Sequence, residues 1–250
     1  MEEFERIVGE EGDRCIGCSV LTGYRTPVLA IEDVQFDYPA ARGEGEGFSF
    51  HLGGLEVDRG ETVAVIGPSG CGKSTLLRLA AGTLRPRTGT VRLDGVDLAG
   101  LGETAMRALR LRSIGFVFQD FRLLGHLDVE ENAMLPFRLG GLRADAAART
   151  RVVDLLERLG IGPLRRRPID RLSHGERQRT AIARALATDP GLVLADEPTG
   201  NLDPSNKRII LEALIGAARD RDAALLAVTH DHDLLDAFDR VVDLAAEVPT

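Results

Sequence analysis

A glycine-rich segment of the chain carries the residue types that bind phosphate. Its glycines allow backbone N–H groups to curl around phosphate oxygens, and the start of the helix expected after it adds partial positive charge. A lysine can reach the outer phosphates, and the serine hydroxyl after it can ligate Mg²⁺. The segment matches the phosphate-binding loop pattern and comprises Gly67, Pro68, Ser69, Gly70, Cys71, Gly72, Lys73 and Ser74.

Two adjacent carboxylates end an apolar run further along the chain. Asp196 and Glu197 directly follow residues 193–195. In open α/β sheets, ligands bind beyond the carboxyl ends of the strands, where these two side chains would lie. Asp196 can hold Mg²⁺, directly or through water, and Glu197 can orient and polarise an attacking water. Together with the phosphate loop, the pair indicates an NTPase.

The elements that must position these residues are indicated by short apolar runs and by helical periods. A helix is predicted from about Lys73 to Ala81, with Gly82 as its C-cap, and a second at about 175–187. Short apolar runs are typical of parallel strands that are buried on both faces. Strands are predicted at 28–36, 62–66, 113–118, 192–195 and 224–228.

The stretch from about 120 to 171 changes character and is predicted to be mostly helical. Val152, Leu155, Leu156 and Leu159 share one helical face, and Gly160 then ends the helix. We interpret this stretch as an inserted helical subdomain. Residues 1–26 show no clear period and are predicted to be a weakly structured extension, while the glycine run at 43–47 predicts a flexible turn.

A third motif separates the classes of phosphate-loop NTPase. The segment 172–179, with Ser173 and Gly175, resembles the signature of the ABC ATPases. Ser173 with Glu176 three residues later is also a capping box, which simply starts a helix, and both interpretations can hold. Two positions depart from the commonest signature, since His174 replaces a glycine and Glu176 replaces a glutamine.

The resemblance covers about residues 28–243 and implies the fold. That fold is α/β: a P-loop NTPase core with a mostly parallel sheet, an antiparallel β subdomain and an inserted helical subdomain. The ABC ATPase domain would span 27–250, with its helical insert at about 120–171, after the extension at 1–26. ATP and Mg²⁺ are the cofactors that the resemblance implies.

The resemblance also assigns the remaining site residues. Tyr38 would stack on adenine, although a tyrosine here is also consistent with strand packing. Gln119 would touch Mg²⁺ and sense the γ-phosphate, and His230 matches the switch histidine, so both join Glu197 as catalytic residues. Thr75 extends the phosphate loop at the start of its helix.

Dimerisation is implied by the signature. Ser173 and Gly175 would contact the γ-phosphate of ATP that is held by the opposite subunit, and Asp203 lies in the loop that crosses the dimer interface. The expected partners are therefore ATP, a second copy or a similar ATPase subunit, and an integral membrane permease. Residues 118–136 resemble the lipoprotein-release, macrolide-export and cell-division group, so an exporter or a mechanical system is expected. The alternative is an ATPase that regulates a membrane-anchored envelope or division partner without transport.

Composition limits the remaining alternatives. The formal net charge of −8 argues against nucleic acid as a partner, and no apolar run approaches the ~18 residues of a membrane span. A cytoplasmic protein, peripheral on the inner face of the cell membrane, is expected. The pair Cys15 and Cys18 could bind metal or form a redox pair, but two thiolates do not fill a tetrahedral zinc site and no second Cys/His pair accompanies them, so neither role is favoured.

Other phosphate-loop classes fit the sequence less well. A small GTPase would need an Asn-Lys-x-Asp motif, and the segment 206–209 lacks the aspartate. Chromosome and repair ATPases need long coiled-coil insertions, which this length excludes. Apolar side chains between Asp120 and Phe137 are expected either to meet the membrane partner or to form the core of the insert; they are Phe121, Leu123, Leu124 and Leu127.

Overall fold

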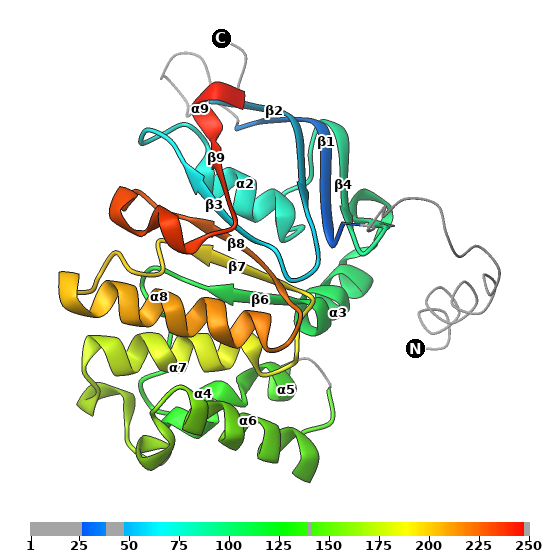
Figure 1. Cartoon of the computed structure of the whole chain (residues 1–250). Coiled ribbons are helices and arrows are strands. Elements are labelled where there is room, and N and C mark those ends of the chain that lie inside the picture. The colour runs from blue at the N-terminus through cyan, green and yellow to red at the C-terminus, as the bar shows by residue number, and fades with distance from the viewer. Residues whose placement is uncertain (1–26, 39–47, 140–141, 248–250) are drawn as a thin grey trace, which may run out of the picture.

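Two sheets form the framework of the computed structural model, which describes residues 27–38, 48–139 and 142–247 (Figure 1). The expected extension with Cys15 and Cys18, and the glycine run at 43–47, lie outside these residues. The first sheet is antiparallel, in the order β2-β1-β4-β5. Its strands are β1 (Leu29–Asp37), β2 (Ser49–Val57), β4 (Thr88–Leu93) and β5 (Val96–Asp97).

The second sheet is parallel throughout, in the order β6-β7-β8-β3-β9. The two sheets confirm the expected α/β class with a parallel core and an antiparallel subdomain. The strands of the parallel sheet are β3 (Thr62–Ile66), β6 (Ile114–Val117), β7 (Leu192–Asp196), β8 (Ala224–Val228) and β9 (Arg240–Asp243).

Helices cover both faces of the parallel sheet. Four of them, α4, α6, α7 and α8, begin at a side-chain cap, as the Asp and Ser residues before them predict. None in the described part of the chain is long and apolar enough to span a membrane. The helices are α2 (Lys73–Ala80), α3 (Glu103–Ser113), α4 (Val129–Ala133), α5 (Leu135–Leu139), α6 (Ala146–Arg158), α7 (His174–Leu186), α8 (Pro204–Arg219) and α9 (Leu244–Glu247), with 3-10 turns at Leu98–Gly100, Gly162–Leu164, Ile169–Arg171 and His232–Ala237.

The core divides into two layers because successive residues of a strand point to opposite faces of the sheet. Val63 and Leu194 belong to the layer that packs against α2 and the antiparallel sheet. Ala64 and Val193, their sequence neighbours, belong to the layer that packs against α7 and α8. The phosphate loop and helix α7 therefore lie on opposite faces of the same sheet (Figure 1).

The stretch from 120 to 171 is helical only from Val129 onward. The predicted apolar face of α6 is buried, and Gly160 follows the helix with a φ of 70°. The stretch is mostly helical, as predicted, but residues 120–128 contain no helix. There the chain forms a loop, because the buried Asn132 side chain bonds the backbone of Leu124 twice, as acceptor from its N–H and donor to its carbonyl, and competes with helix formation.

Candidate nucleotide-binding site

The phosphate loop connects β3 to α2 and leaves the start of that helix open. The cap position, Gly72, has a φ of 101° and supplies no side-chain hydrogen bond, so the first-turn N–H groups remain for a ligand. Lys73 Nζ donates to the carbonyl oxygens of Gly67 at 2.7 Å and Pro68 at 2.8 Å. Ser69, Gly70 and Ser74 are exposed on the same loop. The loop therefore presents an ammonium group, hydroxyls and open N–H groups to solvent.

A glycine is required at position 72 by steric contact as well as by the positive φ. A Cβ at this position would lie 2.8 Å from Phe50 Cε2 and closer still to Cδ2. Phe50 belongs to β2 and is 1% exposed, so its ring has no free space into which to retreat. Only glycine allows the loop to approach the antiparallel sheet this closely.

Aromatic rings form the side of the loop that faces the antiparallel sheet. A cavity of about 370 Å³ is lined by Tyr38, Phe48 and the start of α2. The Tyr38 ring lies 6.2 Å from that of Phe48 and stands edge-on to Phe36 at 4.8 Å. Tyr38 thus borders the cavity and also packs on its strand, as both interpretations of it require. Phe48, which is 40% exposed, was not predicted, because only pairing of the strands shows that it faces Tyr38.

The two carboxylates lie at the carboxyl end of β7, as predicted. Burial, followed by the charge of Glu197, raises the pKa of Asp196. Glu197 adopts a φ of 48°, and its N–H donates to the Val228 carbonyl of β8 at 3.0 Å. Its Oε2 lies 2.6 Å from His230 Nδ1, so the fold joins the predicted water-activating carboxylate to the predicted switch histidine.

The position of His230 is supported by a neighbour that the sequence did not single out. Asp231 pairs with Lys207 of α8 at 2.7 Å, and that lysine lowers the pKa of Asp231. The N–H of Asp231 also donates to the Thr229 hydroxyl at 3.0 Å. These contacts fix the turn that follows β8 and hence the direction of the histidine.

Gln119 lies two residues beyond β6 and is exposed. Asn201 donates to its backbone carbonyl at 2.6 Å. A Cβ built on Gly200 would lie 3.6 Å from Gln119 Nε2 and from Glu197 Cβ. Residues 119, 197 and 200–201, which are far apart in the sequence, therefore meet at one edge of the parallel sheet.

Ser173 and Asp203 are helix caps in this structure. The Ser173 hydroxyl accepts from the Glu176 N–H at 3.3 Å, and the Glu176 carboxylate accepts from the Ser173 N–H at 2.7 Å, so the predicted capping box forms. Asp203 caps α8, and hydrogen bonds from Ser205 and Asn206 lower its pKa to about 2. The fold does not bring Ser173 to the phosphate loop of its own chain, because α7 and α2 lie on opposite faces of the sheet (Figure 1).

The residues suit a Mg²⁺ ion that is shared with a ligand. Among the described residues, no group of three or more His, Cys, Asp or Glu side chains could hold a metal alone. Asp196, with its raised pKa, would gain from a nearby cation, and Ser74 and Gln119 offer neutral oxygens. Mg²⁺ commonly combines one or two carboxylates with phosphate oxygens and water, which fits this donor set.

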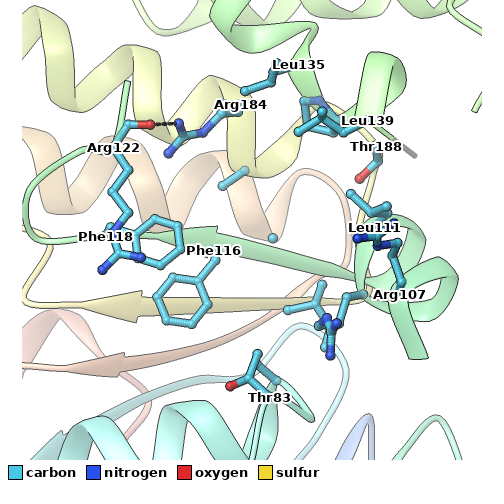
Figure 2. Close-up of a pocket in the computed structure, with 16 residues that line it drawn as sticks. Thr83, Arg107, Leu111, Phe116, Phe118, Arg122, Leu135, Leu139, Arg184 and Thr188 are labelled. Carbon is cyan, nitrogen blue, oxygen red and sulfur yellow. Dashed lines mark hydrogen bonds between the residues drawn. The ribbon is translucent and has the colours of Figure 1, made fainter. Parts of the chain in front are cut away.

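A separate groove of about 580 Å³ lies between α3, β6 and α5 (Figure 2). Its floor carries Phe116 and Phe118, whose rings stack at 4.2 Å, and its rim carries Leu139, which is 66% exposed. The charged residues among those that line it are all arginines: Arg107, Arg110, Arg122 and Arg184.

The apolar side chains expected after Asp120 divide between surface and core. Leu124 is exposed, while Leu123 and Leu127 are half-buried. Phe121 is 9% exposed, as the alternative of a core residue predicts. Its ring turns inward and meets the His174 ring edge-on at 5.9 Å.

Known proteins of similar sequence are ATP-binding subunits. A family model described as ABC transporter matches residues 53–200. The lipoprotein-releasing system ATP-binding protein LolD of Chromohalobacter salexigens is 47% identical, over 76% of this chain and 80% of its own length. The LolD 1 protein of Rhodopseudomonas palustris is 43% identical, over 75% of this chain and 83% of its own length.

Solved structures of similar fold include dimers. The ATP-binding cassette MJ0796, in a dimeric post-hydrolysis state bound to ADP and Pi, aligns with a TM-score of 0.73 and 30% identity, over 86% of this chain and 93% of that one. The CbiO1 protein of Clostridium perfringens, described as part of an ABC transporter complex, aligns with a TM-score of 0.76 and 29% identity, over 87% of this chain and 84% of that one.

Proposed function

The chain belongs to the ABC transporter family, as an ATP-binding subunit that powers a membrane complex, and from this premise we propose that it hydrolyses ATP with the help of Mg²⁺. The family resemblance drawn from the motifs is thereby confirmed. The observation that carries the proposal is the contact between Glu197 Oε2 and His230 Nδ1, 2.6 Å apart at the end of β7. It unites the two groups that a hydrolytic site needs beside its phosphate loop.

Each group of the site has a task that follows from its chemistry. Lys73 exchanges the carbonyls of Gly67 and Pro68 for the outer phosphate oxygens, and the open N–H groups of α2 bind the remaining phosphate charge. Glu197 orients and polarises the attacking water, and His230 holds that carboxylate in place. Mg²⁺, bound by Asp196, Ser74 and Gln119, would neutralise charge on the phosphates.

A second subunit completes the site. Ser173 and Gly175 begin a helix that lies on the opposite face of the sheet from the phosphate loop of the same chain, and a helix N-terminus binds phosphate well. We assign these residues to the ATP held by the opposite copy, with Asp203 at the interface between them. The dimeric arrangement of the similar MJ0796 cassette supports this assignment.

The arginine-lined groove is the proposed docking site for the membrane partner. The groove adjoins the turn that follows Gln119. A segment of the partner bound in the groove would therefore be displaced when a change at the γ-phosphate moves that turn. The apolar floor and arginines suit an amphipathic helix with acidic residues. The LolD relatives suggest a permease of the lipoprotein-release type, with this chain at its cytoplasmic face and with residues 120–171 moving as the inserted subdomain.

Substitution of Glu197 by Gln tests the hydrolysis proposal. The amide keeps the shape of the side chain but cannot polarise water as the carboxylate does, so steady-state ATPase activity should fall by about 10² or more. Binding of ATP, measured by equilibrium fluorescence, should be retained. Glu212→Gln on the exposed surface of α8 is the matched control and should behave as wild type. An unchanged rate in Glu197→Gln would remove this residue from the mechanism.

A mixture of two inactive chains tests the shared site. Lys73→Ala and Ser173→Arg lesions in separate chains fall on the same composite site, so the second site of the mixed dimer remains intact. Mixing the two chains should restore part of the ATPase activity that each lacks alone. No recovery, in a mixture shown by mass spectrometry to contain mixed dimers, would argue against a site completed by the opposite Ser173.

Photo-crosslinking tests the groove. A benzophenone residue at position 139, on the groove rim, should crosslink to a membrane protein that co-purifies with the chain. The same residue at position 209, an exposed apolar site on α8, should not. Equal yields at the two positions would show that the partner does not dock in the groove.

A further inference from the structure

The turn directly after Gln119 has an unusual backbone. Phe121 and Arg122 have φ values of 61° and 47°, and they are the only adjacent non-glycine residues with positive φ in the described part of the chain. Most of the other such residues are aspartates, which tolerate this region better than bulky side chains do. The turn is closed by hydrogen bonds from the Phe121 N–H to the Phe118 carbonyl at 3.1 Å and from the Arg122 N–H to the Asp120 carbonyl at 2.6 Å. A strained turn of this kind persists only where its surroundings hold it.

A buried arginine holds this turn in place. Arg184, in the last turn of α7, is 9% exposed and donates through Nη2 to the Phe121 carbonyl at 2.7 Å and through Nη1 to the Arg122 carbonyl. Figure 2 shows its guanidinium turned toward the Arg122 carbonyl. Burial lowers the pKa of Arg184. No carboxylate among the described residues forms an ion pair with it, so the two carbonyls are its principal partners.

The same turn also touches the first residue of α7. The Phe121 ring meets the His174 ring edge-on at 5.9 Å. His174 and Arg184 are ten residues apart, about 15 Å along the helix, and side chains of a helix lean toward its N-terminus, so Arg184 reaches back to the turn. The turn therefore contacts α7 through residues near both ends of that helix. Neighbouring segments are held by other groups, since Asn201 bonds the Gln119 carbonyl and Asn132 bonds Leu124.

We propose that Arg184 is a positioning residue that ties the turn after Gln119 to helix α7, so that the γ-phosphate sensor and the signature Ser173 move as one body. The proposal rests on the proposed ATPase function and concerns how its two sensing elements are joined. In this role Arg184 acts by holding the turn and not by contact with the nucleotide or the attacking water. Its planar fork satisfies two consecutive carbonyls at once, which a lysine ammonium cannot do in the same geometry.

Arg184→Met, in the full-length chain, is the direct test. Loss of the fork should let Gln119 shift, so kcat should fall by at least about tenfold, while the Kd for ATP stays within about twofold. Arg221→Met is the matched control, because Arg221 is also largely buried and donates to a backbone carbonyl, that of Ala217 at 3.0 Å, away from the turn and from every residue assigned to the site. Its kcat should stay near wild type. Equal losses in the two variants, or a wild-type kcat in Arg184→Met, would overturn the proposal.

Two further measurements separate positioning from general stability. Hydrogen exchange in Arg184→Met should rise at residues 118–124 and stay low in the middle of α7; a uniform rise along α7 would mean that Arg184 only stabilises the helix. Arg122→Gly, which allows the positive φ without strain, should restore part of kcat when added to Arg184→Met, and absence of any recovery would count against a strained turn. If Arg184→Met does not fold, Arg184→Lys replaces it and should give a smaller loss in the same direction.

These readouts distinguish failure of the inference from failure of the proposed function. A wild-type chain without ATPase activity would refute the proposed function, and the exchange pattern would still decide whether Arg184 holds the turn. An active wild type with an unaffected Arg184→Met would refute the inference alone.

Discussion

The closest steric fit in the phosphate loop gives a quantitative prediction for Gly72→Ala. The new Cβ would meet the ring of Phe50 at 2.8 Å or less, at a φ of 101° that L-residues avoid. Gly70 provides a matched control in the same loop, because its φ is 84° and a Cβ there would meet nothing within 4 Å. The two substitutions therefore share the backbone strain, and only the first adds the clash.

The magnitudes follow from these two contributions. Left-handed backbone at a non-glycine residue costs about 1–2 kcal/mol, which is the whole expected loss of unfolding free energy for Gly70→Ala. The clash with Phe50 adds about 1–3 kcal/mol, as overpacking of a filled core does, so Gly72→Ala should lose about 2–5 kcal/mol. For a chain of this size the corresponding falls in Tm are about 2–8 °C and 4–20 °C.

Thermal unfolding without nucleotide measures these losses directly. Gly100→Ala, in open space at an ordinary φ, should be nearly neutral. Adding Phe50→Leu to Gly72→Ala should cost less than the sum of the two single losses, because the smaller side chain relieves the clash. Equal Tm values for the Gly70 and Gly72 variants would refute the steric argument.

Three further predictions concern charge, aromatic contact and packing. Asp196→Asn should raise the Tm of the nucleotide-free chain at neutral pH, because a raised pKa means that the charged carboxylate opposes folding above the unfolded pKa. The gain should shrink as the pH falls and the wild-type carboxyl takes up its proton; a lower Tm at neutral pH would contradict it. Phe48→Ala should weaken ATP binding by about 1–3 kcal/mol in calorimetry if its ring stacks on the base, and unchanged affinity would exclude that contact. Leu156→Ala, fully buried in α6, should cost about 2–5 kcal/mol in urea unfolding, whereas exposed Leu139→Ala should cost little, and similar losses would contradict the burial assigned to them.

The turn after Gln119 has a conformation that the sequence could not predict. The segment has apolar and charged side chains that are typical of a helix. Neither of the two residues with positive φ, Phe121 and Arg122, is a glycine, so no residue type in the segment indicates a left-handed turn. The left-handed turn depends on hydrogen bonds from Arg184, 62 and 63 positions away. No local pattern contains that information, so the sequence predicted neither the left-handed turn nor which of the apolar residues after Asp120 are buried.

The sequence by itself determined the features whose causes are local. Glycine spacing defined the phosphate loop, apolar runs located the buried strands, and Ser173 with Glu176 predicted a capping box that forms. Only the tertiary structure decided which distant groups meet: the parallel order of β7 and β8 places Glu197 against His230, and strand pairing turns Phe48 toward Tyr38. The opposite faces of one sheet also separate Ser173 from the phosphate loop of its own chain. Backbone preference and capping act over a few residues, whereas these pairings arise from strand order and helix packing, which the whole chain decides together.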